Sequence, residues 1–238
     1  MIQQSQQGQH HFLCAIDWGR TIHPELFAPS YWQEHHAVLG QALGRGTTWF
    51  FHHQGCDFVL RHYQRGGAIA RINMDKYIYT GLERTRAWRE WKLLRSLAEQ
   101  GLAVPEAIAT HVHKNLMFYT ADLITAKIPN ACPMATRLRQ DPLAPELWCA
   151  IGKTIRKMHD LQTYHADLNA HNILIDDNAK IWLIDFDRGY QGTVSPQQKQ
   201  SNLDRLERSL QKLQRVETRC YFSPKNWALL QKAYMINK

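Results

Sequence analysis

The sequence HADLNAHNILIDDNAKIWLIDFD, residues 165–187, decides the fold prediction. It contains two short apolar runs rich in isoleucine and leucine, residues 172–176 and 181–185. Asp177 and Asn178 lie between these runs, and both residue types favour turns. β-rich runs on either side of such a turn predict a hairpin.

Four polar residues of this stretch are spaced as phosphoryl transfer requires: His165, Asp167, Asn172 and Asp185. The strands of a hairpin run in opposite directions, so Asn172 and Asp185 are expected at one end, where their oxygens suit Mg²⁺ beside a triphosphate. Asp167 is predicted to orient the acceptor hydroxyl and take its proton. His165 is expected to support the loop through hydrogen bonds and not to act as the base. The pattern therefore predicts phosphate transfer from ATP with Mg²⁺.

Each half of the pattern also has a simpler interpretation. The spacing His-x-Asp-x-x-x-x-Asn occurs often by chance, and a lone Asp after a strand is usually a turn former or a cap. Both halves together, with a hairpin between them and Phe186 after Asp185, require four polar residues and two strands to be placed correctly. The combined pattern favours the phosphoryl-transfer interpretation.

The composition fits one compact enzyme. The chain has 238 residues, of which 44% are hydrophobic, so it can bury a sizeable core. It contains no run of 18 apolar residues, and its first residues, MIQQSQQGQHHF, lack the features of a signal peptide. We therefore expect a cytoplasmic protein. The five cysteines are widely spaced without a CxxC motif, which predicts reduced thiols and neither a disulfide framework nor a zinc site.

The first part of the chain is predicted to be mostly strand. Residues 36–63 contain three β-rich segments, with one glycine turn at Gly44, Arg45 and Gly46 and a second at Gly55. In a kinase-like lobe the first turn covers the triphosphate, because the missing side chains let backbone amides approach the phosphate oxygens. Most glycine turns only reverse the chain direction, so this turn is weak support by itself.

A helix is predicted over residues 82–100, and Gly101 ends it. Its apolar stripe consists of Ala87, Trp91, Leu94 and Ala98. Glu90 lies beside this stripe, where a kinase fold needs a carboxylate to hold the basic residue of the third strand against the phosphates. Arg61 is the basic residue available, although the common pattern has Lys at this position. The alternative is an exposed strand arginine and a solvated helix glutamate.

The rest of the pattern is more helical. Residues 108–115 and 116–124 look like two further strands, and three prolines in residues 130–145 indicate the hinge and the start of a second lobe. After this hinge, a helix that ends at the catalytic loop is predicted from an apolar stripe of Leu147, Trp148, Ile151, Ile155, Met158 and Leu161. Two further helices are predicted over residues 202–216 and 224–237. The tripeptide Gly-Lys-Thr at 152–154 lies inside the first of these helices, so it is not a phosphate-binding loop.

We therefore predict an α+β, protein-kinase-like, two-lobed fold in a single domain of residues 1–238. The N-lobe, residues 1–127, is expected to be small and mostly antiparallel β with one helix. The C-lobe, residues 128–238, is expected to be compact and mostly helical, and to carry the catalytic loop and the metal-binding DFD sequence. About fifty residues follow Asp187, without an APE sequence, which favours a small-molecule or lipid-saccharide acceptor over a protein.

Positive charge is concentrated in one segment. The net charge is +8, and residues 61–95 contain nine Lys or Arg against three Asp or Glu. Such a segment can meet nucleic acid, an anionic lipid surface or a phosphorylated substrate, or it can simply be a solvated helix face. No RNP, helix-turn-helix or zinc-finger pattern accompanies the charge, so we expect no nucleic-acid partner.

Five segments together resemble the bacterial 3-deoxy-D-manno-octulosonic acid (Kdo) kinases across nearly the whole chain. These segments are GRGTTWF, LRHYQRGG, REWKLLRSLAEQGLAVPEAIA, IRKMHDLQTYHADLNAHNILID and WLIDFDRG. The catalytic loop alone fits the wider kinase-like superfamily, which includes aminoglycoside and choline kinases. The RGG and NAHN segments narrow the resemblance to the Kdo kinases.

The resemblance implies ATP-dependent phosphorylation of the 4-hydroxyl of the Kdo sugar on a lipid A precursor, during lipopolysaccharide core assembly at the cytoplasmic face of the inner membrane. By this resemblance, Asp167 matches the catalytic aspartate, and Asn172 and Asp185 match the metal ligands. The chain departs from the superfamily pattern with HAD for HRD, DFD for DFG, and Arg61 for Lys. The first two departures keep the magnesium carboxylate, and the third leaves open how the phosphates are anchored.

The basic segment then acquires a function. A lipid-linked acceptor that carries phosphates and a carboxylate, among anionic headgroups, is expected to attract Arg65, Arg71 and Lys76. We expect residues 65–86 to form the substrate and membrane surface of a peripheral protein, with no obligate protein partner. Two alternatives share the catalytic site: a soluble, aminoglycoside-like small-molecule kinase, and a catalytically dead kinase-like scaffold.

Overall fold

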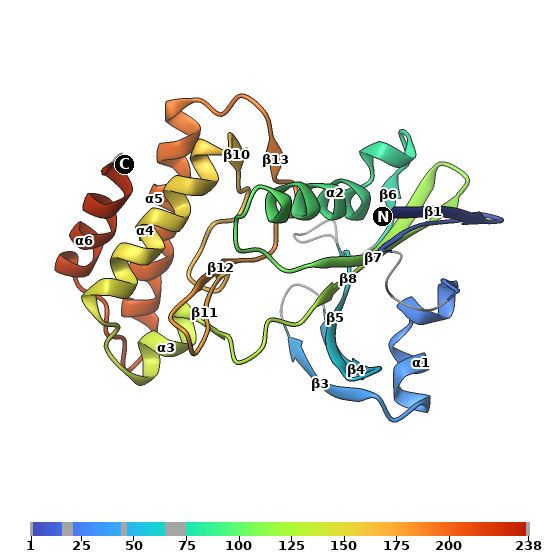
Figure 1. Ribbon diagram of the computed structural model, residues 1–238, viewed down its shortest axis with the longest axis horizontal. Coiled ribbons are helices and arrows are strands. Elements are labelled where there is room, and N and C mark those ends of the chain that lie inside the picture. Colours follow the sequence, from blue (N-terminus) through green and yellow to red (C-terminus); the bar gives the residue numbers. More distant parts are fainter. Residues whose placement is uncertain (1, 16–20, 44–46, 65–74, 237–238) are drawn as a thin grey trace. The chain divides into compact units, whose positions relative to one another are not determined.

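The computed structural model describes residues 2–15, 21–43, 47–64 and 75–236 (Figure 1). The chain divides into two compact units. The first consists of Met1–Arg95 and Glu106–Lys127, and the second of Ser96–Pro105 and Ile128–Lys238.

An antiparallel eight-stranded sheet forms most of the first unit. Its order is β1-β2-β7-β8-β5-β4-β3, with β6 paired to β8. The strands are β1 (Ile2–Gln7), β2 (His10–Ala15), β3 (Val38–Leu43), β4 (Thr47–His53), β5 (Cys56–His62), β6 (Tyr77–Ile78), β7 (Ala107–Asn115) and β8 (Phe118–Ala126). The helical segments are η2 (Pro24–Phe27), α1 (Pro29–Glu34), η4 (Leu82–Arg84) and α2 (Arg86–Glu99), of which α2 continues into the second unit.

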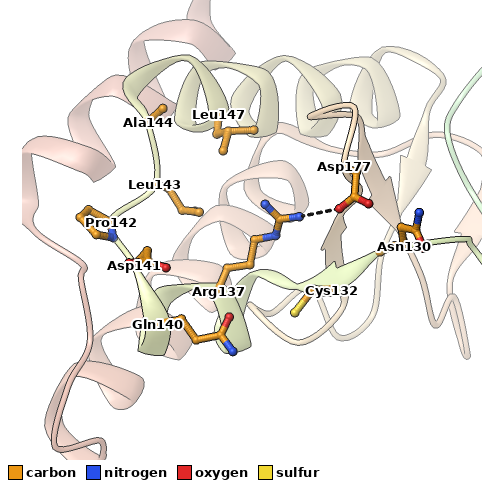
Figure 2. A pocket seen from close by; sticks show the side chains of 11 residues that line it. Asn130, Cys132, Arg137, Gln140, Asp141, Pro142, Leu143, Ala144, Leu147 and Asp177 are labelled. Carbon is orange, nitrogen blue, oxygen red and sulfur yellow. Dashed lines mark ion pairs between the residues drawn. The ribbon is translucent and has the colours of Figure 1, made fainter.

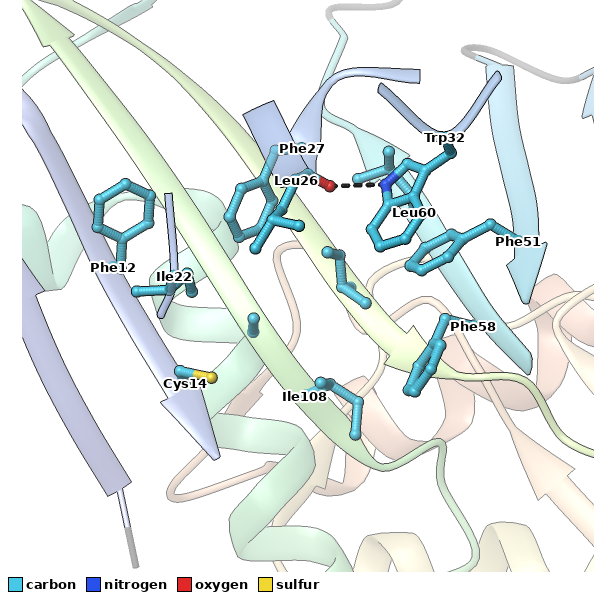
Figure 3. Close-up of a cluster of buried hydrophobic side chains, with 12 residues drawn as sticks. Phe12, Cys14, Ile22, Leu26, Phe27, Trp32, Phe51, Phe58, Leu60 and Ile108 are labelled. Carbon is cyan, nitrogen blue, oxygen red and sulfur yellow. Dashed lines mark hydrogen bonds between the residues drawn. The ribbon is translucent and has the colours of Figure 1, made fainter. Parts of the chain in front are cut away.

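One face of this sheet is covered by η2 and α1. Trp32 of α1 stacks on Phe51 of β4 with ring centroids 3.9 Å apart, and Phe51 stacks in turn on Phe58 of β5 (Figure 3). The indole nitrogen of Trp32 donates a hydrogen bond of 2.8 Å to the carbonyl oxygen of Leu26, so this buried polar group is paired. Aromatic stacking and burial of apolar area stabilise the sheet on this side.

The opposite face receives α2. Successive side chains of a strand point to opposite faces. In β5, Leu60 therefore joins the cluster beneath α1, whereas Arg61 points to the other face and meets Glu90 of α2. The helix buries Trp91 and Leu94 there almost completely.

The second unit is mostly helical. Its elements are β9 (Cys132–Pro133), α3 (Met134–Gln140), α4 (Pro145–Asp160), β10 (Thr163–Tyr164), β11 (Ile173–Ile175), β12 (Ile181–Leu183), β13 (Tyr190–Gln191), α5 (Pro196–Val216) and α6 (Pro224–Met235). Helices α4 and α6 pack along each other (Figure 1). Strands β11 and β12 form the antiparallel hairpin expected from the sequence, and β9 pairs with β11.

The predicted fold class, an α+β kinase-like fold, is confirmed. The predicted strands in residues 36–63 are β3, β4 and β5, and the two strands predicted after the helix are β7 and β8. That the whole chain acts as one kinase domain divided at residues 127 and 128 stays a prediction.

Several local expectations need correction. The segment predicted as the hinge and the start of the second lobe, residues 130–145, lies in the second unit and contains β9 and α3, which were not predicted. Helix α5 begins at Pro196, six residues before the predicted start, because Ser195 and Gln198 form a capping box at its N-terminus. In α2, Leu97 is buried and Ala98 is exposed, so the stripe advances by three residues in the last turn and not by four. In the part of the chain that the structure describes, no helix combines the length and the apolar character needed to cross a bilayer.

Candidate active site

His165 supports the loop around Asp167 through hydrogen bonds, as expected. Its Nδ1 accepts a hydrogen bond of 3.1 Å from the backbone N–H of Asp167, so Nε2 carries the proton and donates to the carbonyl oxygen of Ile184 at 3.0 Å. The ring is fully buried, and burial lowers its pKa. His165 is therefore a neutral brace between the loop and the strand that ends before Asp185.

Two asparagines close the loop around the carbonyl oxygen of Asp167. The side-chain amides of Asn169 and Asn172 both donate to this oxygen at 2.9 Å. Asn169 also accepts a hydrogen bond of 2.8 Å from the backbone N–H of His171. Because the Asn172 amide nitrogen is used in this way, its Oδ1 is the atom left to act as a ligand.

The register of the hairpin places Asn172 and Asp185 at the same end. Ile173 lies opposite Leu183, and the backbone N–H of Ile184 donates to the carbonyl oxygen of Asn172 at 3.0 Å. Asp185 is the next residue, with a φ of 61°, in the left-handed region that non-glycine residues adopt rarely and that is enriched at functional sites. The amide oxygen of Asn172 and the carboxylate of Asp185 are thus carried at the same end of two adjacent strands.

Asn202 of α5 anchors the loop from outside, which the sequence analysis missed. Its side chain accepts from the backbone N–H of His165 at 3.3 Å and donates to the His165 carbonyl oxygen at 2.6 Å. The residue is 1% exposed and sits on the apolar face that contains Leu203 and Leu206. A polar residue within that stripe was the available signal, because a buried amide requires hydrogen-bond partners.

His159 of α4 extends this buried network. Its Nε2 donates to Oδ1 of Asn202 at 3.1 Å, and its Nδ1 accepts from the hydroxyl of Tyr234 at 2.8 Å. Burial lowers the pKa of His159 to about 4, although the hydrogen bond to Asn202 opposes the shift. Between pH 6.5 and 4 the unfolded chain therefore binds a proton at this ring that the folded chain does not bind, and stability falls as the pH falls.

We expect acidification to weaken the second unit through His159. From pH 7 to pH 5 this ring should lower the free energy of unfolding by about 2 kcal/mol. Urea denaturation of the parent and a His159→Gln variant at both pH values measures this effect, since glutamine keeps hydrogen-bonding capacity without titrating. The variant should lose less stability on acidification than the parent, whereas a control variant with exposed His35→Gln should behave like the parent. Equal losses in parent and His159→Gln would contradict the assignment.

Arg205 is the second residue that the sequence analysis missed. It lies one turn after Asn202 in α5, and its NH1 group donates to Oδ1 of Asp167 at 2.7 Å. Both side chains are partly exposed, at 45% for Arg205 and 33% for Asp167. The candidate base therefore has a cationic neighbour supplied by a helix 38 residues further along the chain.

In the first unit, Arg61 and Glu90 form an ion pair. The NH2 group of Arg61 donates to Oε2 of Glu90, and the hydroxyl of Tyr63 donates to the same oxygen at 2.5 Å. Glu90 is 3% exposed, so its charge depends on these partners. Burial raises the pKa of Tyr63 well above its usual value, so the hydroxyl stays a donor. The pairing that the sequence suggested is present, and its role toward phosphate stays a prediction.

Of the remaining predicted site residues, only Lys76 lies within the described part of the chain. Gly44, Arg45 and Gly46 of the glycine turn, and the basic residues Arg65 and Arg71, lie outside the described residues. Lys76 is described, and its side chain is exposed immediately before β6.

The second unit also contains a pocket of about 530 Å³ between α3, the α3–α4 connection and the β11–β12 turn (Figure 2). Arg137 on its wall lies 3.8 Å from a carboxylate oxygen of Asp177 and donates to the carbonyl oxygen of Asp176 at 3.4 Å. Its lining includes none of the predicted site residues, so it is separate from the loop around Asp167.

The α+β fold, with the His165–Asp167 loop beside a hairpin whose second strand leads to Asp185, is typical of a kinase-like phosphotransferase. Comparison with known proteins narrows this class. The model of the lipopolysaccharide kinase (Kdo/WaaP) family matches residues 29–234. A protein of Vibrio cholerae serotype O1, named 3-deoxy-D-manno-octulosonic acid kinase, is 48% identical over 184 residues, which are 77% of this chain and 78% of the relative.

A protein of Mannheimia succiniciproducens with the same name is 44% identical over 240 residues, covering 97% of this chain and 98% of the relative. A further relative with this name, from Photobacterium profundum, is 43% identical over 87% of each chain. The chain belongs to the lipopolysaccharide kinase (Kdo/WaaP) family. The resemblance noted in the sequence is thereby confirmed.

Proposed function

We propose that this chain transfers the γ-phosphate of ATP to the 4-hydroxyl of a Kdo sugar on a lipid A precursor. The observation that carries this proposal is the similarity to the Mannheimia succiniciproducens protein, which extends over 97% of the chain at 44% identity. The braced loop around Asp167 supports the same reaction. The product is a phosphorylated sugar of the lipopolysaccharide inner core.

Asp167 acts as the general base in this proposal. Its Oδ1 is held by Arg205, so Oδ2 is the oxygen that accepts the hydrogen bond of the acceptor hydroxyl. As the hydroxyl oxygen attacks the γ-phosphorus, its proton passes to Asp167, and the bond from the γ-phosphorus to the bridging oxygen breaks to release ADP. The neutral His165 and the two loop asparagines keep the carboxylate in position while this occurs.

Asn172 and Asp185 are the residues that would hold Mg²⁺. An amide oxygen and a carboxylate at one end of a hairpin suit this ion, which keeps several waters and substrate phosphates among its ligands and needs few protein groups. When bound, the ion supplies positive charge beside the triphosphate.

Arg61 is proposed to anchor the phosphates, with Glu90 and Tyr63 fixing its position. A guanidinium binds phosphate through parallel hydrogen bonds, whereas the lysine of the common pattern acts as a point charge. The buried carboxylate of Glu90 holds one end of the guanidinium in place. The glycine turn at Gly44, Arg45 and Gly46 is proposed to cover the same phosphates with backbone amides.

The basic segment is proposed to hold the protein at the cytoplasmic face of the inner membrane. The acceptor is lipid-linked, and each Lys or Arg near an anionic bilayer contributes about 1 kcal/mol to binding. Arg65, Arg71 and Lys76 belong to the segment with most of the excess positive charge, and the Lys76 side chain is exposed. The protein would thus meet its substrate at the membrane surface.

Neutralising Arg65, Arg71 and Lys76 to Gln should weaken binding to anionic vesicles by up to about 100-fold, because three such charges contribute about 3 kcal/mol. Flotation with phosphatidylglycerol-containing vesicles at low salt measures this. A triple variant at Lys153, Lys212 and Arg215, which are exposed residues of the second unit, removes the same charge elsewhere and should bind like the parent. Equal weakening of vesicle binding in both variants would mean that binding depends on net charge alone, and would contradict a defined membrane surface.

Transfer of labelled phosphate tests the function directly. Purified protein is incubated with labelled ATP, Mg²⁺ and Kdo-bearing lipid A precursor, beside the same lipid with the 4-hydroxyl removed. Label should enter the first lipid and not the second. Label in an aminoglycoside and not in the lipid would favour a soluble small-molecule kinase, and the absence of any turnover would favour a dead scaffold.

A further inference from the structure

Arg205 occupies a position that fold stability does not explain. Its guanidinium lies on the solvent-accessible side of α5 and contacts Asp167 at 2.7 Å, while 45% of its side chain remains exposed. Exposed ion pairs of this kind contribute little to the free energy of unfolding. Within the described parts of the chain, Asp167 is its one side-chain partner. The pair therefore places a cation beside Asp167 without being needed to hold the fold together.

The geometry of the pair leaves room for a second anion. One terminal nitrogen of Arg205 contacts one oxygen of Asp167, so most of the five N–H donors of the guanidinium remain for another group. Guanidinium groups bind carboxylates through two parallel hydrogen bonds. The contact with Asp167 shows that the guanidinium of Arg205 reaches a carboxylate beside the proposed base.

The acceptor of the proposed function supplies such an anion. An octulosonic acid carries a carboxylate on the ring carbon that is two positions from the carbon with the 4-hydroxyl. A protein that holds the hydroxyl at a base and the carboxylate at a cation must keep base and cation a few ångströms apart, as Asp167 and Arg205 are. The nucleotide phosphates have other proposed partners in Asn172, Asp185 and Arg61.

We propose that Arg205 binds the carboxylate of the acceptor sugar and so selects an acidic sugar over a neutral one. This inference rests on the proposed function and names the acceptor feature that the site reads. In the complex, the guanidinium bridges the substrate carboxylate and Oδ1 of Asp167, and the second oxygen of Asp167 meets the 4-hydroxyl. Arg205 then determines both the specificity for the acceptor and its orientation.

The test compares two acceptors, lipid-linked Kdo and its carboxyl methyl ester, with four proteins. The parent should prefer the free acid by about 10- to 100-fold in kcat/KM, the range expected for hydrogen bonds to a charged group. Arg205→Ala should accept both with a ratio near one, and Arg205→Lys should fall between. Arg215→Ala is the matched control, because it removes the same charge from the same helix about 15 Å away, and it should keep the parent ratio.

The ratio of kcat/KM for the free acid to kcat/KM for the ester separates recognition of the carboxylate from other roles of Arg205. If Arg205→Ala lowers turnover of both acceptors by one common factor, Arg205 only positions Asp167, and the inference is wrong. A parent that does not distinguish acid from ester also overturns it, while its transfer activity leaves the proposed function standing. A parent that labels neither acceptor overturns the proposed function and this inference together. Arg205→Lys keeps the test decisive if the alanine variant does not fold.

Discussion

An Asp167→Asn variant is expected to lose phosphate transfer by about 10²- to 10⁴-fold in kcat, the range for removal of a general base. Asparagine has nearly the same shape as aspartate, and its side-chain oxygen can still accept the hydrogen bond from Arg205. The loop should therefore keep its conformation, and the acceptor should still bind. What the amide cannot do is take the proton of the attacking hydroxyl, so the loss should appear in kcat more than in KM.

Single-turnover transfer of labelled phosphate to the lipid-linked acceptor measures this effect. The matched control is Asp177→Asn, which changes an exposed aspartate in the β11–β12 turn of the same unit and should leave transfer unchanged. Thermal unfolding of both variants should match the parent. If Asp167→Asn retains transfer within about threefold of the parent, proton removal by this residue is not needed, and its role reduces to orientation.

A Gly152→Ala variant is expected to lose about 3 kcal/mol of unfolding free energy, at the upper end of the range for overpacking. Gly152 lies in α4 where this helix crosses α6. A Cβ atom at this position would lie 2.3 Å from the carbonyl oxygen of Leu230 and 3.1 Å from the backbone nitrogen of Tyr234. Both atoms are backbone, so no side-chain rotation relieves the contact, and the helices must separate.

Urea denaturation of the purified variant measures this loss. The higher helix propensity of alanine opposes the clash by up to about 1 kcal/mol. The sign of the change in unfolding free energy therefore shows which of the two effects is larger. The control is Lys153→Ala at the next, exposed position of α4, which should change stability by less than about 0.5 kcal/mol. A Gly152→Ala protein as stable as the parent would contradict the close approach of α4 and α6.

The same glycine illustrates how much the sequence reveals. The apolar stripe on α4 correctly predicted a helix through residues 152–154 and excluded a phosphate-binding loop there. It did not reveal why residue 152 has no side chain, because the reason is the backbone of a helix some 80 residues later. Periodicity indicates which face of a helix is buried and does not indicate what lies against that face.

The first strands of the chain were missed for a related reason. Strand β1 has the sequence IQQSQQ, which is polar on both faces and lacks the alternation of a half-buried strand. It forms because β2 offers an edge to pair with, from Ile2 opposite Ala15 to Gln7 opposite His10. Backbone hydrogen bonding to a neighbouring strand therefore determined this element, and side-chain pattern did not.

Tertiary structure also gave the histidines of the first unit their partners. Asp122 is buried and accepts hydrogen bonds from His62 at 2.6 Å and His111 at 3.0 Å. Burial raises the pKa of this carboxyl, and the two hydrogen bonds outweigh it, so that the net pKa is lowered. His10 of β2 approaches His111 at 2.9 Å across the sheet. The sequence alone indicated none of these contacts.

By itself, the sequence determined the family, from segments along nearly the whole chain, and the features that depend on neighbours within about twenty residues: the hairpin, the three-stranded meander and the order Asp167, Asn172, Asp185. Local turn preference, strand alternation and helical periodicity act over that distance. Only the tertiary structure decided that Asn202 holds the loop and that Arg205 reaches Asp167, 37 and 38 residues away from their partners. Those contacts depend on how α5 packs against the loop, and the angle and rotation of a packed helix are set by all the surfaces that meet there.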